Sequence, residues 1–175
     1  MRTRRTLVLF SLILLSSSLF LALFGKKKFD PKPPLTVEEI NGKALYRRFS
    51  VEEDYENYPY WPGHDGVRPG QSPHGDFHQI YVHPYLYDKL PIQSRVAPEG
   101  SIIVKCNLGA EKEIKVFTVM AKVKGYNPDA GDWFWAKISK EGDVLEEGKI
   151  VSCIDCHSAL KDNDYLIIHK LERGK

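Results

Sequence analysis

The five residues CIDCH, at positions 153–157, place the strongest restriction on what this chain can fold into. Two cysteines separated by two residues and followed directly by a histidine are typical of covalent haem attachment, in which the thiols bond the porphyrin edge and the histidine binds iron. The chain printed here ends at residue 175, so little of it follows the motif. A fold that encloses a haem must therefore build most of its pocket from residues before Cys153.

Three other chemistries use the same residue types. A zinc site needs four ligands, whereas Cys153, Cys156 and His157 are three, and their adjacency suits a tetrahedron poorly. A redox-active cysteine pair prefers a thioredoxin-like βαβ context, which the sequence does not show. A structural disulfide is the third alternative. If Cys153 and Cys156 hold haem, the remaining cysteine, Cys106, is expected to be a buried free thiol.

The N-terminal region predicts export. Residues 6–24 are apolar apart from hydroxyls, and the cluster RTRR precedes them. A helix of this length is about as long as the hydrocarbon core of a membrane is thick, and the cations favour a cytoplasmic N-terminus. Residues 1–25 are therefore expected to form a signal anchor or a cleaved signal peptide, and the lack of a good A-x-A-like site favours the anchor. Both alternatives send the rest of the chain to the periplasm or another extracytoplasmic space, anchored to the inner membrane in the first case.

The distribution of charge gives no reason to expect a nucleic-acid partner. Residues 1–28 contain six Lys and Arg side chains and no acid, so the other 19 basic side chains of the chain are outnumbered by 23 acidic ones. A net-acidic domain lacks the electrostatic footprint of a nucleic-acid-binding protein.

The rest of the chain divides into a tether and one domain. Residues 26–36 are proline-rich and are expected to be extended. The domain covers residues 37–175 and begins with a predicted helix at 37–49, for which Thr36 and Glu39 form a capping box. Residues 55–75 contain many aromatic residues, prolines and glycines, so they are expected to form an irregular loop that covers part of the domain.

The hydrophobic pattern of the domain is that of an α+β fold. Apolar and β-branched residues predict strands at 77–83, 100–107, 113–125 and 132–139. Pro84 opens a helical turn over 84–90, and a short helix is expected to begin at the CIDCH motif. We therefore predict a single domain with an antiparallel β-sheet flanked by helices.

The position of the motif excludes one class of cytochrome. Small electron-carrier cytochromes have an early motif and a methionine ligand far downstream, but Met1 and Met120 both precede this motif. Met120 is expected to be a packed thioether. Four-helix cytochromes do have a late motif, but the predicted strands and the many prolines do not fit four long amphipathic helices.

Several blocks of the sequence together resemble the cytochrome P-460 family. They appear in the expected order over residues 40–168, and they are HGDFHQIYVHP, APEGSIIVKCN, FTVMAKVKGYNPDAGDWFWAKI and GKIVSCIDCHSALKDNDYL. The resemblance implies a small exported haem protein, often dimeric, with an antiparallel sheet and flanking helices. The family includes hydroxylamine-oxidising enzymes and the related nitric-oxide-binding cytochromes c′-beta, whose iron has a proximal histidine and an open distal side.

The resemblance assigns roles to four residues. Cys153 and Cys156 match the thioether positions and His157 matches the proximal iron ligand, which implies one covalent haem c per chain. Lys105 matches the lysine that in the enzymes bonds covalently to the haem edge. The alternative for Lys105 is a surface lysine whose stem lies along an edge strand. An acid follows the lysine in the family pattern, whereas here Cys106 does.

The distal residue is less well defined by the sequence. His78 matches an arginine on the distal side in some members, and it is predicted to bind a distal ligand, accept a proton or coordinate iron; its alternative is a half-exposed sheet histidine. His74 is a second candidate, and Glu146 or Glu147 is expected to offer a distal carboxylate. The remaining histidines are expected to lie on the surface or to be structural, and they are His64, His83 and His169.

These features together predict a mono-haem cytochrome that binds and oxidises a small nitrogen compound, hydroxylamine or nitric oxide. Lys105 and His78 are the expected catalytic residues, and a redox partner protein is expected to take the electrons. The alternative is a protein without a lysine–haem bond that carries or senses nitric oxide or transfers electrons.

Overall fold

The structure is a computed structural model that describes residues 32–167 and 170–171. Among these residues, no helix is both long enough and apolar enough to cross a membrane. The predicted anchor or signal helix of residues 1–25 and His169 lie outside the described residues, so both expectations stay predictions.

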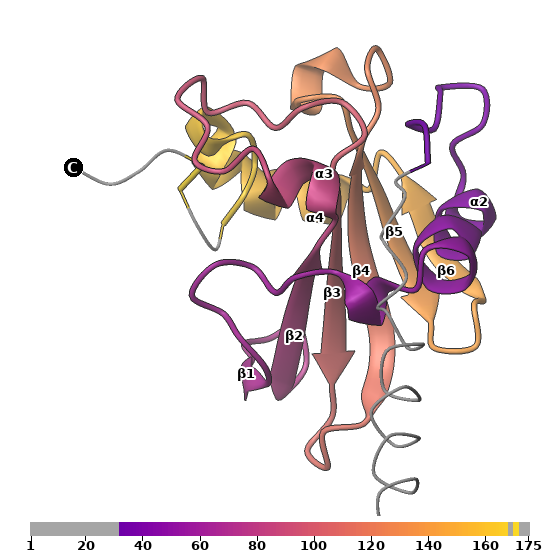
Figure 1. Cartoon of the computed structure of the whole chain (residues 1–175). Coiled ribbons are helices and arrows are strands. Elements are labelled where there is room, and N and C mark those ends of the chain that lie inside the picture. The colour runs from indigo at the N-terminus through magenta and orange to yellow at the C-terminus, as the bar shows by residue number, and fades with distance from the viewer. Residues whose placement is uncertain (1–31, 168–169, 172–175) are drawn as a thin grey trace, which may run out of the picture. The chain divides into compact units, whose positions relative to one another are not determined.

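The core of the fold is a six-stranded antiparallel sheet in which the strands follow one another in chain order (Figure 1). The strands are β1 Arg68–Pro69, β2 Phe77–Val82, β3 Ile102–Leu108, β4 Ile114–Lys122, β5 Trp133–Ser139 and β6 Val144–Gly148. The four predicted strands correspond to β2–β5. The two edge strands were not predicted, because β1 has only two residues and the sequence of β6 is largely polar and exposed.

Short helices cover the sheet, which confirms the predicted α+β class. They are α2 Gly42–Tyr46, the π-helical turn Arg47–Glu52, the 3-10 helix Tyr55–Asn57, α3 Pro84–Tyr87, the 3-10 helix Pro128–Ala130, α4 Val151–His157 and the 3-10 helix Ser158–Asn163. In Figure 1, α2 (indigo) and α4 (yellow) lie on different sides of the sheet. The predicted turn at Pro84 and the predicted helix at the CIDCH motif are both present.

The first helix begins later than predicted. Asn41 is its N-cap, and the Asn41 side chain accepts a hydrogen bond of 2.9 Å from the backbone nitrogen of Ala44. The predicted capping pair closes only an isolated turn, in which Glu39 accepts from the backbone nitrogen of Thr36 at 3.0 Å. The first residue of this helix is Gly42. A larger residue would not fit there, because a Cβ at this position would lie 2.6 Å from Oε2 of Glu147.

The register of the strands separates two faces of the sheet. Ile80, Lys105 and Thr118 are direct partners on β2, β3 and β4, and Val82, Ile103, Met120 and Trp135 form a second row across β2–β5. Because side chains alternate along a strand, these rows share one face. We call it the cavity face. The opposite face, which we call the packed face, carries Val104, Cys106, Phe117, Val119, Ala121 and Ile138.

Aromatic rings from the N-terminal helices cover the packed face. Phe49 is fully buried and contacts Phe117 edge-on with 5.4 Å between ring centroids. Tyr55 contacts the same ring at 5.4 Å, also edge-on. Edge-to-face pairs of this kind add to the free energy gained by burying the rings. Cys106 lies on this face as a buried free thiol, as predicted.

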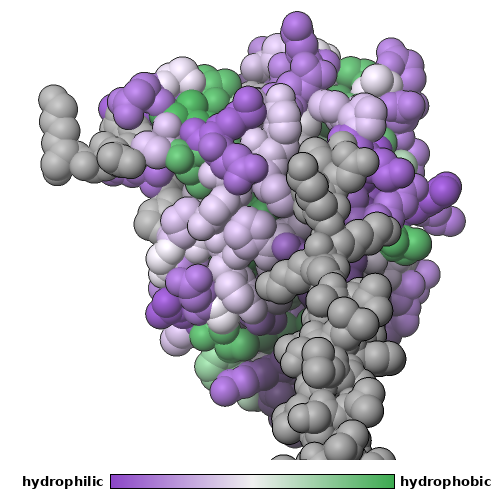
Figure 2. All heavy atoms as spheres, in the orientation of Figure 1, coloured by the Kyte–Doolittle hydropathy of each residue, from purple (hydrophilic) through white to green (hydrophobic). Residues whose placement is uncertain are grey.

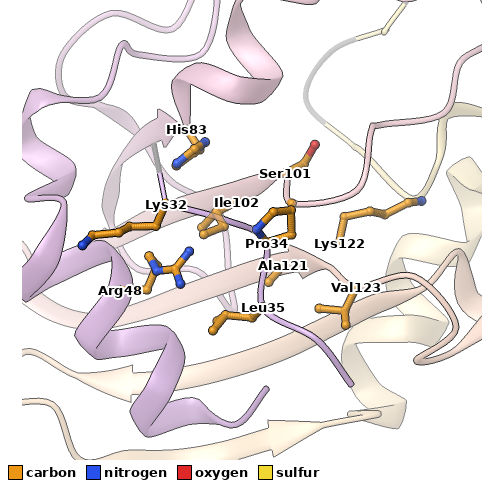
Figure 3. Close-up of a pocket in the computed structure, with 11 residues that line it drawn as sticks. Lys32, Pro34, Leu35, Arg48, His83, Ser101, Ile102, Ala121, Lys122 and Val123 are labelled. Atoms are coloured by element: carbon orange, nitrogen blue, oxygen red, sulfur yellow. The ribbon is translucent and has the colours of Figure 1, made fainter. Parts of the chain in front are cut away.

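The tether is attached to the packed face where the structure describes it. Residues 32–36 have no regular structure, and residues 26–31 of the predicted tether lie outside the described residues. Pro33 accepts a hydrogen bond of 2.7 Å from Nη1 of Arg48, and the backbone nitrogen of Lys32 donates to Glu53 at 3.2 Å. Figure 3 shows Pro34 and Leu35 beside the sheet in a small pocket that they line together with Ile102, Ala121 and Val123.

The cavity face carries one apolar cluster of the domain. Its buried members include Val82, Leu86, Ile103, Trp133, Trp135, Ile150, Leu166 and Leu171. Residues after the CIDCH motif therefore contribute directly to the core. On the side of the molecule seen in Figure 2, apolar residues lie in small separate groups among polar ones.

The packing of Phe49 gives a test of the packed face. Phe49→Ala removes three edge-on ring contacts and is expected to lower the free energy of unfolding by about 3–5 kcal/mol, measured by denaturant unfolding. The control is Val51→Ala, two residues away and 69% exposed, which is expected to change stability by less than about 0.5 kcal/mol. Equal effects of the two substitutions would contradict this description of the core.

Candidate haem-binding site

A cavity of about 480 Å³ lies against the cavity face. Its walls are formed by side chains of β2–β5, by the loop from Pro69 to His74, by α4 and by Leu166 and Ile167. Trp61, from the aromatic loop, also lines it. The volume falls within the range of pockets that hold cofactor-sized ligands. This supports the prediction that the aromatic loop at 55–75 covers part of the domain.

The CIDCH motif lies in the wall of this cavity. Cys153, Cys156 and His157 all line it. They occupy positions i, i+3 and i+4 of α4, and side chains at this spacing lie on one face of a helix. Ile150 is buried at the N-cap of α4 and Ile154 packs against the same apolar cluster, which keeps this helix face turned toward the cavity.

His157 is held in one orientation. Its Nδ1 lies 2.7 Å from the carbonyl oxygen of Tyr165, and because a carbonyl only accepts, Nδ1 carries the proton. Nε2 then has a free lone pair, as a metal ligand requires. Trp135 packs edge-on against the imidazole with 4.7 Å between ring centroids. Burial lowers the pKa of His157, although the hydrogen bond to Tyr165 opposes this effect, and the neutral ring is the form that binds metal.

Lys105 reaches the same cavity from the middle of the sheet. It lies on β3 between its strand partners Ile80 and Thr118, and all three line the cavity. Burial lowers the pKa of Lys105 to about 8. Lys105 and Ile103 lie on the same face of β3, as the strand register shows. A surface lysine on an edge strand, the alternative for this residue, does not describe a half-buried lysine on an inner strand of the sheet.

Two histidines line another part of the cavity wall. His78 lies on β2 opposite Arg68, and His74 lies in the loop before it. Burial, and secondarily the positive charge of Lys105, lowers the pKa of each histidine to about 4. Both imidazoles are therefore neutral near pH 7 and can accept a proton or bind a metal. The structure thus brings His78 and His74 into the cavity that contains Lys105 and the CIDCH motif.

The residues of the cavity fit a haem. Two thiols and an imidazole nitrogen on one helix face match the attachment chemistry, and the walls are largely apolar. Both ring nitrogens of His78 and Nε1 of Trp135 are buried without a hydrogen-bond partner among the described residues. Buried polar atoms are rarely left unpaired, so these atoms point to a bound group.

Other expectations about distal ligands need correction. Neither Glu146 nor Glu147 lines the cavity. The Glu146 carboxylate pairs with Nζ of Lys137 at 2.6 Å, and the Glu147 carboxylate accepts a hydrogen bond from the backbone of Gly42. Both acids lie on the exposed edge strand β6, which sequence proximity to the motif did not reveal.

His83, His64 and Met120 have the structural environments that were expected. Nε2 of His83 lies 3.2 Å from the Glu53 carboxylate, and Nδ1 of His83 accepts from the backbone of α3, so His83 is structural. His64 is half-buried with its ring centroid 6.4 Å from that of His78, and it is not among the residues that line the cavity. Met120 is buried in the apolar cluster.

The alternatives to haem attachment receive no support from the geometry. Cys153 and Cys156 are free thiols, so they do not form the alternative disulfide. Within the described part of the chain, no three His, Cys, Asp or Glu side chains are arranged to hold a metal ion between them. The motif lies after an antiparallel edge strand, whereas a thioredoxin-like pair would have a βαβ context.

Sequence reasoning missed two groups that contact His157. Trp135 falls within the strand predicted at 132–139, but nothing in the sequence indicated that its ring would pack against His157. The carbonyl of Tyr165 is a backbone group, so no residue type marks it. The neighbouring Asp164, which forms a buried ion pair with Lys122, was also not identified.

Comparison with known proteins agrees with this site. The family model Cytochrome P460 matches residues 53–168, which cover most of the described domain, including Lys105, His78 and the whole CIDCH motif. No curated protein matches the chain. The family implies a haem cofactor, which the cavity residues fit. Since the match covers well over half of the sequence, this chain belongs to the cytochrome P460 family.

Proposed function

We propose that this protein is an exported, membrane-anchored mono-haem c-type cytochrome that binds and oxidises a small nitrogen compound such as hydroxylamine. The observation that carries the proposal is the convergence of Cys153, Cys156, His157 and Lys105 in one cavity. Cys153 and Cys156 would hold the porphyrin edge by thioether bonds, and Nε2 of His157 would bind iron on the proximal side. The haem would supply a redox-active iron that takes the nitrogen of the substrate.

His78 is the proposed proton acceptor in this cavity. Oxidation of hydroxylamine releases protons, and a neutral imidazole within reach of the substrate can accept them. A pKa of about 4 keeps His78 neutral above about pH 5, and its ring nitrogens have no hydrogen-bond partner among the described residues. His74, with a similarly lowered pKa, is a second acceptor on the same wall. Apolar residues around them would limit the access of water.

Lys105 is the proposed site of a further bond to the haem edge. A pKa of about 8 means that roughly a tenth of the side chains carry a neutral, nucleophilic amine at pH 7, against well under a thousandth for an ordinary lysine. The position on an inner strand and the half-buried side chain support this role. Forming the bond would replace an N–H of the amine and a C–H of the haem edge, releasing two protons and two electrons, and the proposed redox partner would take the electrons. The bond would distort the macrocycle and tune its redox chemistry.

A second function, non-enzymatic binding or sensing of nitric oxide, or electron transfer, has one observation in its favour. The acid that follows the lysine in the family pattern is replaced by Cys106. Cys106 is buried on the packed face, and burial raises its pKa to about 12, so it carries no charge near pH 7. If an ionised acid is needed to form the lysine–haem bond, this chain lacks it at that position.

The proposal includes partners and a location. Residues 1–25 would anchor the domain to the outer side of the inner membrane through the tether at 26–36. A redox partner protein in the periplasm would take the electrons, and a homodimer is the proposed assembly. Export accords with the CIDCH motif, because bacteria attach haem c outside the cytoplasm.

The absorption spectrum of the ferrous protein tests the role of Lys105. The chain is produced with cytochrome c maturation, and a strongly red-shifted Soret band is expected if the lysine–haem bond forms. Lys105→Ala is expected to restore an ordinary c-type spectrum and abolish hydroxylamine oxidation, whereas Lys115→Ala, at an exposed lysine, changes neither. An ordinary c-type spectrum in the unmutated protein would exclude the bond and favour the binding function.

Thiol titration tests the covalent attachment. The chain has three cysteines, and thioether bonds consume two of them, so the denatured holoprotein is expected to react with one equivalent of a thiol reagent. The folded holoprotein is expected to react with none at pH 8, because Cys106 is fully buried and its pKa is about 12. Three reactive thiols after denaturation would contradict haem attachment at Cys153 and Cys156.

A substitution of His78 tests the proton acceptor. His78→Gln is expected to lower the rate of hydroxylamine oxidation by about 10²–10⁴-fold, because general base catalysis contributes on this scale. The matched control is His64→Gln, close to His78 but not among the cavity-lining residues, and its rate is expected to change little. If the unmutated protein instead has a six-coordinate low-spin spectrum that His78→Ala removes, then His78 binds iron and electron transfer is the better assignment.

A further inference from the structure

A tight turn at Asp164 and Tyr165 lies beside the proximal histidine. Both residues have left-handed backbone conformations, with φ of 56° and 65°. Side chains other than glycine rarely adopt this conformation, and two consecutive cases persist only where surrounding contacts hold them in place. The turn follows the short 3-10 helix Ser158–Asn163, which itself continues from α4.

The contacts that hold this turn converge on Asp164. Its carboxylate accepts from Nζ of Lys122 at 2.6 and 2.7 Å and from the backbone nitrogen of Ala97 at 2.7 Å. Its backbone carbonyl accepts from Nε1 of Trp133 at 2.9 Å. Strand β4, strand β5 and the segment before β3 are therefore all joined to this one residue.

The ion pair itself is deeply buried. The side chains of Lys122 and Asp164 are 8% and 5% exposed, and Nζ of Lys122 lies 4.9 Å from the centre of the Trp133 ring. Removing two charges from water costs free energy, and the attraction between the charges often does no more than balance that cost. A buried ion pair is therefore weak evidence for stability by itself. What such a pair does impose is one geometry, because both charged groups must keep their partners.

The side chain of Tyr165 is also held in place at its hydroxyl group. Its hydroxyl donates to the carbonyl of Asp129 at 3.0 Å. The turn also packs closely on Gly131, where an added Cβ would lie 2.9 Å from Oδ1 of Asp164 and 3.1 Å from the Tyr165 ring. The backbone between these anchors has little freedom to rotate.

These contacts fix the position of the backbone carbonyl of Tyr165, which accepts a hydrogen bond from Nδ1 of His157 at 2.7 Å. We infer that the buried Lys122–Asp164 pair is a positioning element that aims the Tyr165 carbonyl at His157 and so sets the donor strength of the proximal ligand. The inference rests on the proposed ligation of iron by His157. Neither Lys122 nor Asp164 lines the cavity, so both act through Tyr165 and His157.

The direction of the effect follows from the hydrogen bond. A carbonyl that accepts from Nδ1 makes Nε2 more basic, and a more basic ligand donates more electron density to iron. More donation stabilises the ferric state relative to the ferrous state. Losing the alignment of the Tyr165 carbonyl therefore weakens the iron–histidine bond and raises the reduction potential.

The test is the double variant Lys122→Met with Asp164→Asn in the full-length holoprotein. It removes both charges together, so no unpaired charge is left buried, and the asparagine can still accept from Ala97. We expect the iron–histidine stretching band of the ferrous protein to move to lower frequency in resonance Raman spectra. We also expect reduction to become about tenfold more favourable, which is 59 mV for one electron.

The matched control removes the buried pair on the packed face, by Glu53→Gln with His83→Gln. Those side chains are 2% and 4% exposed, so the loss of a buried pair is comparable. The other contacts of Glu53 are with the Tyr58 hydroxyl and the backbone nitrogen of Lys32, on the packed face. The control is expected to lower the melting temperature and to leave the stretching band and the potential unchanged. A second variant, Gly131→Ala, keeps both charged residues but places a methyl group 2.9 Å from Oδ1 of Asp164 and 3.1 Å from the Tyr165 ring. It is expected to displace the turn and to shift both readouts in the same direction as the double variant.

The outcomes separate this inference from the proposed function. If neither the double variant nor Gly131→Ala shifts the stretching band or the potential, or if the Glu53–His83 control shifts them equally, the inference is overturned while the haem assignment stands. A chain that carried no haem after cytochrome c maturation would overturn both, because the inference needs His157 as an iron ligand. A shift confined to the variants near Asp164 supports it.

Discussion

The antiparallel register of β2–β5 is the constraint on which the rest of the structure depends. Because neighbouring residues on a strand face opposite ways, Lys105 enters the cavity while Cys106 enters the packed core. A slip of one residue would exchange them, burying an ammonium group among Phe117 and Tyr55 and placing a thiol in the cavity. Both faces of the sheet are covered, so neither exchange could be relieved by solvent. The site therefore exists only in the register that also gives the apolar core.

The same constraint explains the electrostatics of the cavity. The ionisable groups that line it are a lysine, three histidines and two thiols, without a carboxylate among the lining residues that the structure describes. Burial keeps the histidines neutral and lowers the pKa of Lys105 to about 8. A buried carboxylate would have paired with Lys105 and raised its pKa back toward the usual value, leaving almost no neutral amine. The separation of Glu146 and Glu147 from the cavity thus preserves neutral nitrogen bases where the proposed chemistry needs them.

Much of the fold followed from the sequence because its signals were periodic. The sequences of the inner strands alternate between apolar and polar residues, and this pattern predicts a strand whatever sheet it belongs to. The edge strands β1 and β6 are short or polar and carry no such signal. The capping pair Thr36 and Glu39 did form its hydrogen bond, but Asn41 offered a stronger helix start beside Gly42. The site was predictable where a residue type carries the chemistry, as in the CIDCH motif and Lys105. It was not predictable where closeness in sequence to the motif was taken for closeness in space, as for Glu146. It was also not predictable where the contact is made by a backbone carbonyl, as for Tyr165.

The segment that follows the motif is short, but it has a role in the site. A haem needs walls on both sides, and the residues before Cys153 supply the sheet and the aromatic loop. In the proposed site the proximal ligand also needs a hydrogen-bond acceptor for its Nδ1. The left-handed turn at Asp164 and Tyr165 supplies it, because the Tyr165 carbonyl lies 2.7 Å from Nδ1 of His157. Such a turn is costly for these residues, and the ion pair from β4 together with the indole of Trp133 offsets that cost. The core thus holds the turn in place and the turn orients His157, so in the proposed haem site the properties of the iron would depend on Lys122 and Asp164, which do not line the cavity.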